Sequence, residues 1–113
     1  MGVKRAWRLK SGSDVQRVWQ QGATWAHPLI ILRTRANGLE QSRVAFVVSK
    51  KIGGAVARNR AKRLMREAIR PKFLDTVQGY DLVLIGRNAI AQASWHEIAA
   101  AVDELLRRAK LLK

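Results

Sequence analysis

Basic side chains are concentrated in residues 50–70, at a density that predicts phosphate binding. This stretch contains eight Lys and Arg side chains and one acid, Glu67, so its local charge is +7, half of the net +14. Acidic neighbours are too few to neutralise the cations, and the planar guanidinium of arginine suits bidentate contact with phosphate. Binding a polyanion also releases its condensed counterions. The stretch therefore favours a nucleic-acid surface over a merely solvated face.

The candidate contacts are the cations of this stretch and one amide. They are Lys50, Lys51, Arg58, Asn59, Arg60, Lys62, Arg63, Arg66 and Arg70. Asn59, between two arginines, is either a helix cap or a contact to the ligand. At Gly53-Gly54 a tight turn is a better interpretation than a phosphate-cradling loop, because no Gly-Lys-Ser/Thr sequence follows.

The other polar residues give no sign of a catalytic centre within the chain. The two histidines, His27 and His96, are far apart, and the eight carboxylates form no pair on a shared face. We find no nucleophile with a base beside it and no metal-ligand spacing. If the chain takes part in catalysis, we expect the reactive centre to lie in a partner.

Length and composition indicate one domain over residues 1–113, with residues 1–12 as a flexible basic N-terminus. The chain has 113 residues, 48% of them hydrophobic, which is enough for a modest core. It has no cysteine, long apolar run or apolar leader, so we expect a cytoplasmic protein that does not enter a membrane. A pI near 11.6 leaves nucleic acid or an anionic membrane as partner. The narrow, Ala-rich apolar face of the basic stretch favours nucleic acid.

The first half of the chain predicts a helix and two strands. Residues 14–21 have helical spacing, with Ser13 as N-cap and Gly22 as the C-terminal stop. Residues 24–35 and 43–49 are apolar and strand-like, and the turn signal Asn37-Gly38 between them predicts a hairpin. The continuously apolar run 44–48 predicts a central strand covered on both faces.

The second half predicts two further helices around one buried strand. Residues 57–70 show an apolar arc beside cations that recur every fourth residue. Residues 82–85 are continuously apolar. Ser94 and Glu97 form a capping-box pattern that opens a helix over 95–110.

The order of residues in the basic stretch resembles the protein subunit of bacterial ribonuclease P. The resemblance is carried by Val48-Ser49-Lys50-Lys51, by Gly53–Val56, by Arg58-Asn59-Arg60 with Lys62-Arg63, and by Arg66-Glu67. It extends over nearly the whole chain, since residues 8–22 resemble the first helix of the family and residues 81–87 its late strand. The resemblance implies an α/β (α+β) two-layer sandwich, similar to a ribosomal-protein domain. The fold would combine a small mixed sheet of about four strands with three helices and would contain a left-handed βαβ crossover.

The resemblance also implies a function. The family's subunit binds a catalytic RNA and the single-stranded 5′ leader of precursor tRNA, and the RNA removes the leader by Mg²⁺-dependent hydrolysis. We therefore expect a monomeric accessory protein in a ribonucleoprotein, with no catalytic residue, no metal ligand and no small-molecule cofactor of its own. Mg²⁺ would be held mainly by the RNA subunit.

The implied leader-binding cleft combines the first helix with the sheet. Its residues are Val15, Trp19, Ile31, Arg33 and Arg87. Val15 and Arg33 stand where the family often has aromatic residues, so leader binding would depend more on charge. Trp19 could stack on a base or pack in the core.

Two other classes of protein suit the composition. One is a ribosomal or ribosome-associated RNA-binding protein without a catalytic role, which only the motif around Arg58–Arg63 separates from the first interpretation. The other is a small DNA-binding architectural protein, although the sequence has no helix-turn-helix spacing and no dimer zipper.

Overall fold

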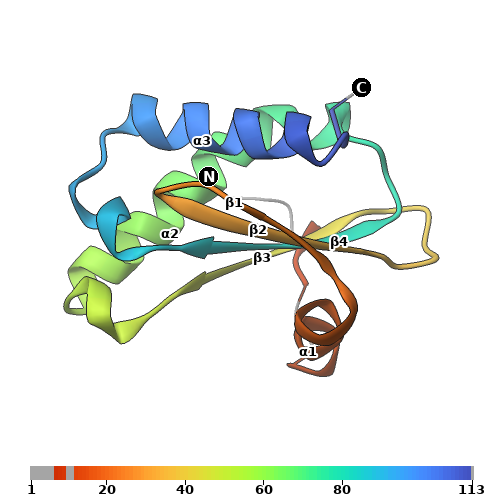
Figure 1. Ribbon diagram of the computed structural model, residues 1–113, viewed down its shortest axis with the longest axis horizontal. Helices are drawn as coiled ribbons and strands as arrows, with labels where there is room; N and C mark the ends of the chain where they lie inside the picture. Colours follow the sequence, from red (N-terminus) through yellow and green to blue (C-terminus); the bar gives the residue numbers. More distant parts are fainter. Residues whose placement is uncertain (1–6, 10–11, 113) are drawn as a thin grey trace.

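The computed structural model describes residues 7–9 and 12–112, which form a sheet with helices on both faces. The elements are α1 (Gly12–Gln21), β1 (Ala23–Ala26), β2 (Ile30–Ala36), β3 (Arg43–Val48), α2 (Ala55–Ile69), β4 (Tyr80–Gly86) and α3 (Trp95–Arg108). Short 3-10 turns are η2 (Lys50–Ile52), η3 (Arg70–Asp75) and η4 (Asn88–Gln92). Helices α2 and α3 cover one face of the sheet, and α1 lies on the other (Figure 1). The predicted α+β architecture is confirmed.

The sheet is mixed, with strand order β1-β2-β4-β3. β1 pairs with β2 and β2 with β4 in antiparallel fashion, whereas β3 and β4 are parallel. A parallel pair needs a crossover connection, and α2 supplies it between β3 and β4. The predicted strand–helix–strand crossover is therefore confirmed, and its left-handed sense stays a prediction.

Two apolar clusters hold the layers together. The larger lies between the sheet and helices α2 and α3, and Trp7 joins it by stacking on Phe73 at a ring-centroid distance of 4.6 Å. The smaller joins Leu9 and Val18 of the α1 side to Val83 of the sheet. Residues 7–9 are thus part of the domain, and residues 1–6, 10 and 11 of the predicted flexible N-terminus lie outside the described residues.

The predicted hairpin between residues 24–35 and 43–49 is wrong. Residues 27–29, which include Pro28, split the first segment into β1 and β2, and the hairpin forms between those two strands. β2 then pairs with β4, which lies between β2 and β3. The Asn37-Gly38 signal predicts a turn, but it does not predict which strand pairs with β2 after that turn.

The prediction of a central strand at 44–48 is also wrong. β3 lies at the edge of the sheet, and β4, with the apolar run 82–85, lies inside it between β2 and β3. Both faces of β3 are nevertheless covered, because Phe46 and Val48 pack against the larger cluster while Ala45 and Val47 pack against the smaller. The apolar run at 44–48 indicates that both faces of the strand are covered, and this can also be true of a strand at the edge of the sheet.

Helix ends follow local chemistry where a side chain makes the cap. The capping box of Ser94 and Glu97 is present, with Glu97 N–H donating to Ser94 Oγ over 3.2 Å. Helix α1 already begins at Gly12, so Ser13 lies inside it and is not its cap. Helix α2 begins at Ala55 with Gly54 as its N-cap, which places Asn59 in the helix and excludes the capping role for it.

Candidate RNA interface

One edge of the sheet gathers the cations that follow β3 and β4. The two strands are parallel, so their carboxyl ends meet there, with Lys50 and Lys51 in η2 and Arg87 at the end of β4. All three side chains are exposed. Arg87 and Ser49 line an open hollow of about 370 Å³, together with Ile85. The sheet topology thus joins basic residues that are nearly forty positions apart.

Helix α2 presents the other predicted cations. Its buried face consists of Ala61, Leu64, Met65, Ala68 and Ile69. With 3.6 residues per turn, the remaining positions face outward and form two open hollows. One is lined by Lys62 and Arg66 with Arg8 and Phe46, and the other by Asn59, Arg60, Arg63 and Arg66 with Val56. Arg70, exposed at the start of η3, extends the same basic surface.

Several of these arginines are held in place by their own chain. Arg58 donates to Gly53 O over 2.9 Å, and Arg60 donates to Ala93 O over 3.1 Å. The Arg66 guanidinium lies 5.9 Å from the centre of the Phe46 ring. Arg63 is different, since its side chain is 61% exposed and its nearest carboxylate, Glu67, is 3.9 Å away. A guanidinium has five N–H donors, so one internal bond leaves capacity for phosphate.

The sheet face below α1 is organised in three cross-strand rows. The first row is Ala26, Ile31, Ile85 and Val47, the second is Thr24, Arg33, Val83 and Ala45, and the third is Arg35, Asp81 and Arg43. Val83 is fully buried against Val18 of α1, whereas Ile31, Ile85 and Val47 of the first row are only half-buried. The first row therefore forms an apolar floor that α1 does not fully cover, leading toward Arg87.

The predicted cleft residues lie around this floor. Val15 packs on the smaller apolar cluster, and Ile31 belongs to the first row. Trp19 is 41% exposed, so it does not pack in the core. The Arg33 guanidinium lies over its ring, 5.2 Å from the centroid. Arg87 donates to His27 O over 3.4 Å at the far end.

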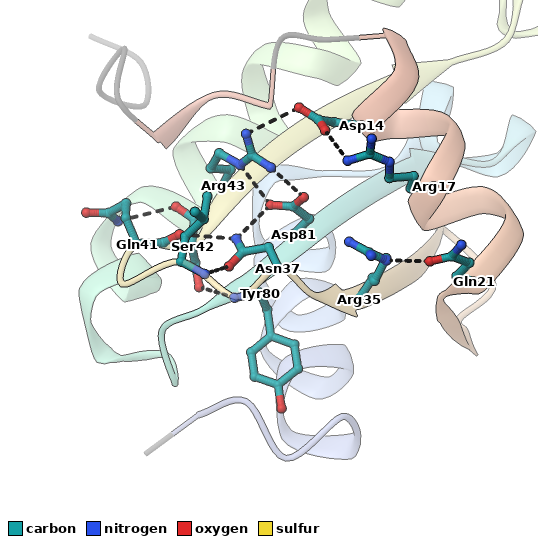
Figure 2. A network of polar contacts seen from close by, with 11 residues as sticks. Asp14, Arg17, Gln21, Arg35, Asn37, Gln41, Ser42, Arg43, Tyr80 and Asp81 are labelled. Atoms are coloured by element: carbon teal, nitrogen blue, oxygen red, sulfur yellow. Dashed lines mark hydrogen bonds and ion pairs between the residues drawn. The ribbon is translucent and has the colours of Figure 1, made fainter.

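A polar network that the sequence did not indicate supports this face (Figure 2). Asp81, only 2% exposed, accepts from Arg43 Nε and Nη2 over 2.9 and 2.8 Å and from Asn37 over 2.8 Å. Arg43 also reaches Asp14 of α1 at 3.3 Å. The pKa of Arg43 is raised above its ordinary value, mainly by its hydrogen bond with Asp81. The network joins α1 to β3, β4 and the loop after β2.

Sequence reasoning also missed two residues of the basic surface, Arg8 and Phe46. Phe46 belongs to an apolar run that was interpreted as core, and only the edge position of β3 leaves its ring beside Arg66. In the part of the chain that the structure describes, no three His, Asp or Glu side chains group together in a way that could hold a metal ion. No described helix is long and apolar enough to span a membrane.

A basic crossover helix on a small mixed sheet with a partly exposed apolar row on its other face defines a class of compact α+β proteins suited to binding nucleic acid. The sequence profile of the family Ribonuclease P matches residues 3–110. The chain is 44% identical over 110 residues to the Ribonuclease P protein component of Dehalococcoides mccartyi (strain CBDB1), covering 97% of this chain and 90% of that one. It is 39% identical over 112 residues to that of Roseiflexus sp. (strain RS-1), covering 98% and 92%.

Solved structures agree with the sequence relatives. The RNase P protein of Staphylococcus aureus superposes with a TM-score of 0.88 at 28% identity, covering 96% of this chain and 100% of that one. That of Thermotoga maritima gives 0.81 at 28% identity, covering 89% and 96%. The chain belongs to the ribonuclease P protein family. Its role is that of the accessory protein subunit of this tRNA-maturing endoribonuclease, a ribonucleoprotein, and a purely ribosomal role is not favoured.

Proposed function

We propose that the α2 surface binds the catalytic RNA of ribonuclease P and that the groove beside α1 binds the unpaired 5′ leader of precursor tRNA. The observation that carries the proposal is the shared edge of the sheet. The cations of η2, which those of α2 follow in the chain, lie at the same edge as Arg87, where the apolar floor flanked by the exposed Trp19 ends. Phosphate contacts position a nucleic acid, while stacking on apolar and aromatic surfaces accepts any base.

The RNA-binding residues of the proposal are those named from the sequence, with two additions. They are Lys50, Lys51, Arg58, Asn59, Arg60, Lys62, Arg63, Arg66 and Arg70, joined by Arg8 and Phe46. For the leader, Val15, Trp19, Ile31 and Arg87 line or flank the groove. A groove of this kind reads little sequence, which suits a subunit that serves many precursors in the cytoplasm as a monomer.

Mg²⁺, when bound, would supply the chemistry of the hydrolysis by activating water and stabilising the leaving oxygen. Hard divalent cations prefer several oxygen ligands in one place. The described carboxylates of this chain form no such group, and Asp14, Asp81 and Asp103 are already paired with arginine or lysine. We therefore assign the Mg²⁺ ions to the RNA. This chain contributes charge neutralisation and the position of the leader.

Reconstitution tests the proposal. The protein is mixed with a bacterial ribonuclease P RNA and a labelled precursor tRNA, at a Mg²⁺ concentration too low for the RNA alone to cleave. We expect restored cleavage at the mature 5′ end, because the protein replaces part of the cation requirement. Tight RNA binding without any stimulation of cleavage would contradict the proposal.

A further inference from the structure

Helix α1 is attached to the sheet mainly by side chains at its two ends. Only Val18 of α1 is buried, so the apolar contact beneath it is small. At the N-terminal end, Asp14 is bound by Arg43 of β3 at 3.3 Å. At the C-terminal end, Arg33 and Arg35 of β2 reach up to the helix. Position and tilt of α1 therefore depend on polar attachments more than on a broad core.

Arg33 makes the backbone contacts at the C-terminal end. Its Nε donates to Val18 O over 3.4 Å, and its Nη2 donates to Trp19 O and, over 3.5 Å, to Gly22 O. The last carbonyls of a helix carry partial negative charge and lack partners within the helix; of those that Arg33 binds, Val18 O also accepts from Gly22 N–H over 2.9 Å. The last turn of α1 contains no basic residue of its own. The cation that the helix lacks is supplied by the neighbouring strand.

The same guanidinium also lies over Trp19, 5.2 Å from the ring centroid. It thus contacts both the backbone and the exposed aromatic ring of one helix turn. Arg35, on the same face of the same strand, donates among the described residues only to the amide side chain of Gln21, over 2.8 Å. Arg33 thus binds backbone carbonyls of α1, whereas Arg35 binds a side chain. Arg35 is therefore a matched control for Arg33.

We propose that Arg33 is a positioning residue, which fastens the C-terminal turn of α1 to β2 and thereby fixes Trp19 beside the leader groove, rather than a ligand of leader phosphates. The proposal rests on the proposed function, since the groove has a purpose only if a leader binds there. It revises the expectation that the positive charge at position 33 contacts the leader directly. Its donors are directed at α1 carbonyls instead.

Replacement by lysine separates the two roles. Arg33→Lys keeps the charge, so it preserves a phosphate contact, but a single ammonium cannot bind several carbonyls and also lie over an indole ring as the planar guanidinium does. Arg33→Gln removes the charge as well and serves as the second variant. Arg35→Lys is the control. Far-UV circular dichroism and urea denaturation of each protein verify that it is folded.

Two readouts are compared. The first is amide hydrogen exchange of residues 18–22 in the free protein, which we expect to be about tenfold faster in Arg33→Lys than in the wild type or Arg35→Lys. The second is the leader preference of the reconstituted holoenzyme, measured as the ratio of Kd for mature tRNA to Kd for precursor tRNA. We expect this ratio to fall about fivefold in Arg33→Lys and Arg33→Gln and to stay unchanged in Arg35→Lys.

Each outcome has a distinct meaning. Unchanged exchange in Arg33→Lys overturns the proposal, and so does faster exchange with an intact leader preference. Loss of leader preference in Arg33→Gln alone, with Arg33→Lys equal to the wild type, would make position 33 a phosphate contact. A wild-type holoenzyme that shows no leader preference overturns the proposed function of the groove itself, whatever the exchange rates.

Discussion

At the scale of single residues, the arginines of this chain divide by what their guanidinium groups bind. Arg43 is bound to a buried carboxylate, and Arg33, Arg58 and Arg60 donate to backbone carbonyls. Arg63 extends into solvent with only a loose ion pair. The sequence placed Arg58, Arg60 and Arg63 together as RNA contacts and gave Arg43 no role, because composition does not reveal which guanidinium groups the fold already uses. Mutations at these positions should therefore differ in whether stability or RNA affinity changes.

Arg63→Ala should weaken affinity for the ribonuclease P RNA about fivefold, by removing about 1 kcal/mol of phosphate attraction. Its free energy of unfolding should stay within about 0.5 kcal/mol of the wild type, because the side chain is 61% exposed. Filter binding and urea denaturation measure the two quantities. Arg107→Ala, an equal charge change on α3 at 69% side-chain exposure, should weaken RNA affinity only slightly, through the net charge. Equal weakening by both variants would contradict the assignment of the surface.

Asp81→Asn should lower the free energy of unfolding by about 2–3 kcal/mol, because it weakens charge-assisted hydrogen bonds and leaves Arg43 without its buried partner. The midpoint of urea denaturation should fall with an unchanged slope. Asp103→Asn is the comparison, since that carboxylate is 30% exposed and pairs with Lys72 and Arg107 at the surface. We expect it to cost less than about 1 kcal/mol. A larger loss in Asp103→Asn than in Asp81→Asn would refute this ranking.

At the scale of elements, helices were predictable from the sequence and strand partners were not. Helical spacing and the Ser94–Glu97 box act within a few residues, so α2 and α3 were located to within about two residues at most ends. Pairing of β2 with β4 joins residues about fifty positions apart and depends on how the helices pack. The basic surface on α2 could be predicted for the same reason, because its residues follow the helical spacing of one segment. The groove floor, which includes Val47 and Ile85, depended on strand order and was missed.

The capping box at the start of α3 should contribute measurably to stability. Ser94→Ala should lower the free energy of unfolding by about 1 kcal/mol at neutral pH, because α3 loses the acceptor for Glu97 N–H. Thermal or urea denaturation measures the loss. Ser94→Asp is the comparison, because an aspartate at the N-cap keeps a side-chain oxygen that can accept from the same N–H. An equal loss in both variants would argue against a specific capping contribution.

The pH dependence of the same cap follows from Glu97. Its pKa is lowered from the ordinary 4.5, chiefly because its carboxylate accepts the Ser94 backbone N–H. A depressed pKa means that the contribution is fully present above pH 4.5 and is lost as the pH falls through the lower, folded-state value. Glu97→Gln should therefore destabilise the protein at pH 7 and bring its stability closer to the wild type in acid. A difference that is the same at both pH values would contradict this linkage.

At the scale of the whole molecule, charge is distributed unevenly between the layers. The net charge is +14, and half of it falls in residues 50–70, which span η2, α2 and the first residue of η3. On α3, by contrast, Asp103 and Glu104 pair with Arg107 and Arg108. An RNA should therefore be attracted to the molecule as a whole but be oriented by one side of it.

The salt dependence of RNA binding tests this asymmetry. If at least four phosphates are neutralised, log K should fall with log monovalent salt with a slope of about −3 or steeper, because each phosphate contact releases counterions. The triple variant of Lys62, Arg63 and Arg66 to Ala should flatten the slope by about 2. The double variant of Arg107 and Arg108 to Ala, on α3, should weaken long-range attraction slightly and leave the slope as it was. The measurement is a salt titration of binding to the ribonuclease P RNA at constant Mg²⁺. A flat wild-type slope would exclude binding through phosphates. Counterion release depends on the phosphates that the protein contacts, so only cations at the interface should change the slope. Equal flattening per charge by the α2 and α3 variants would therefore mean that the RNA responds only to the net charge.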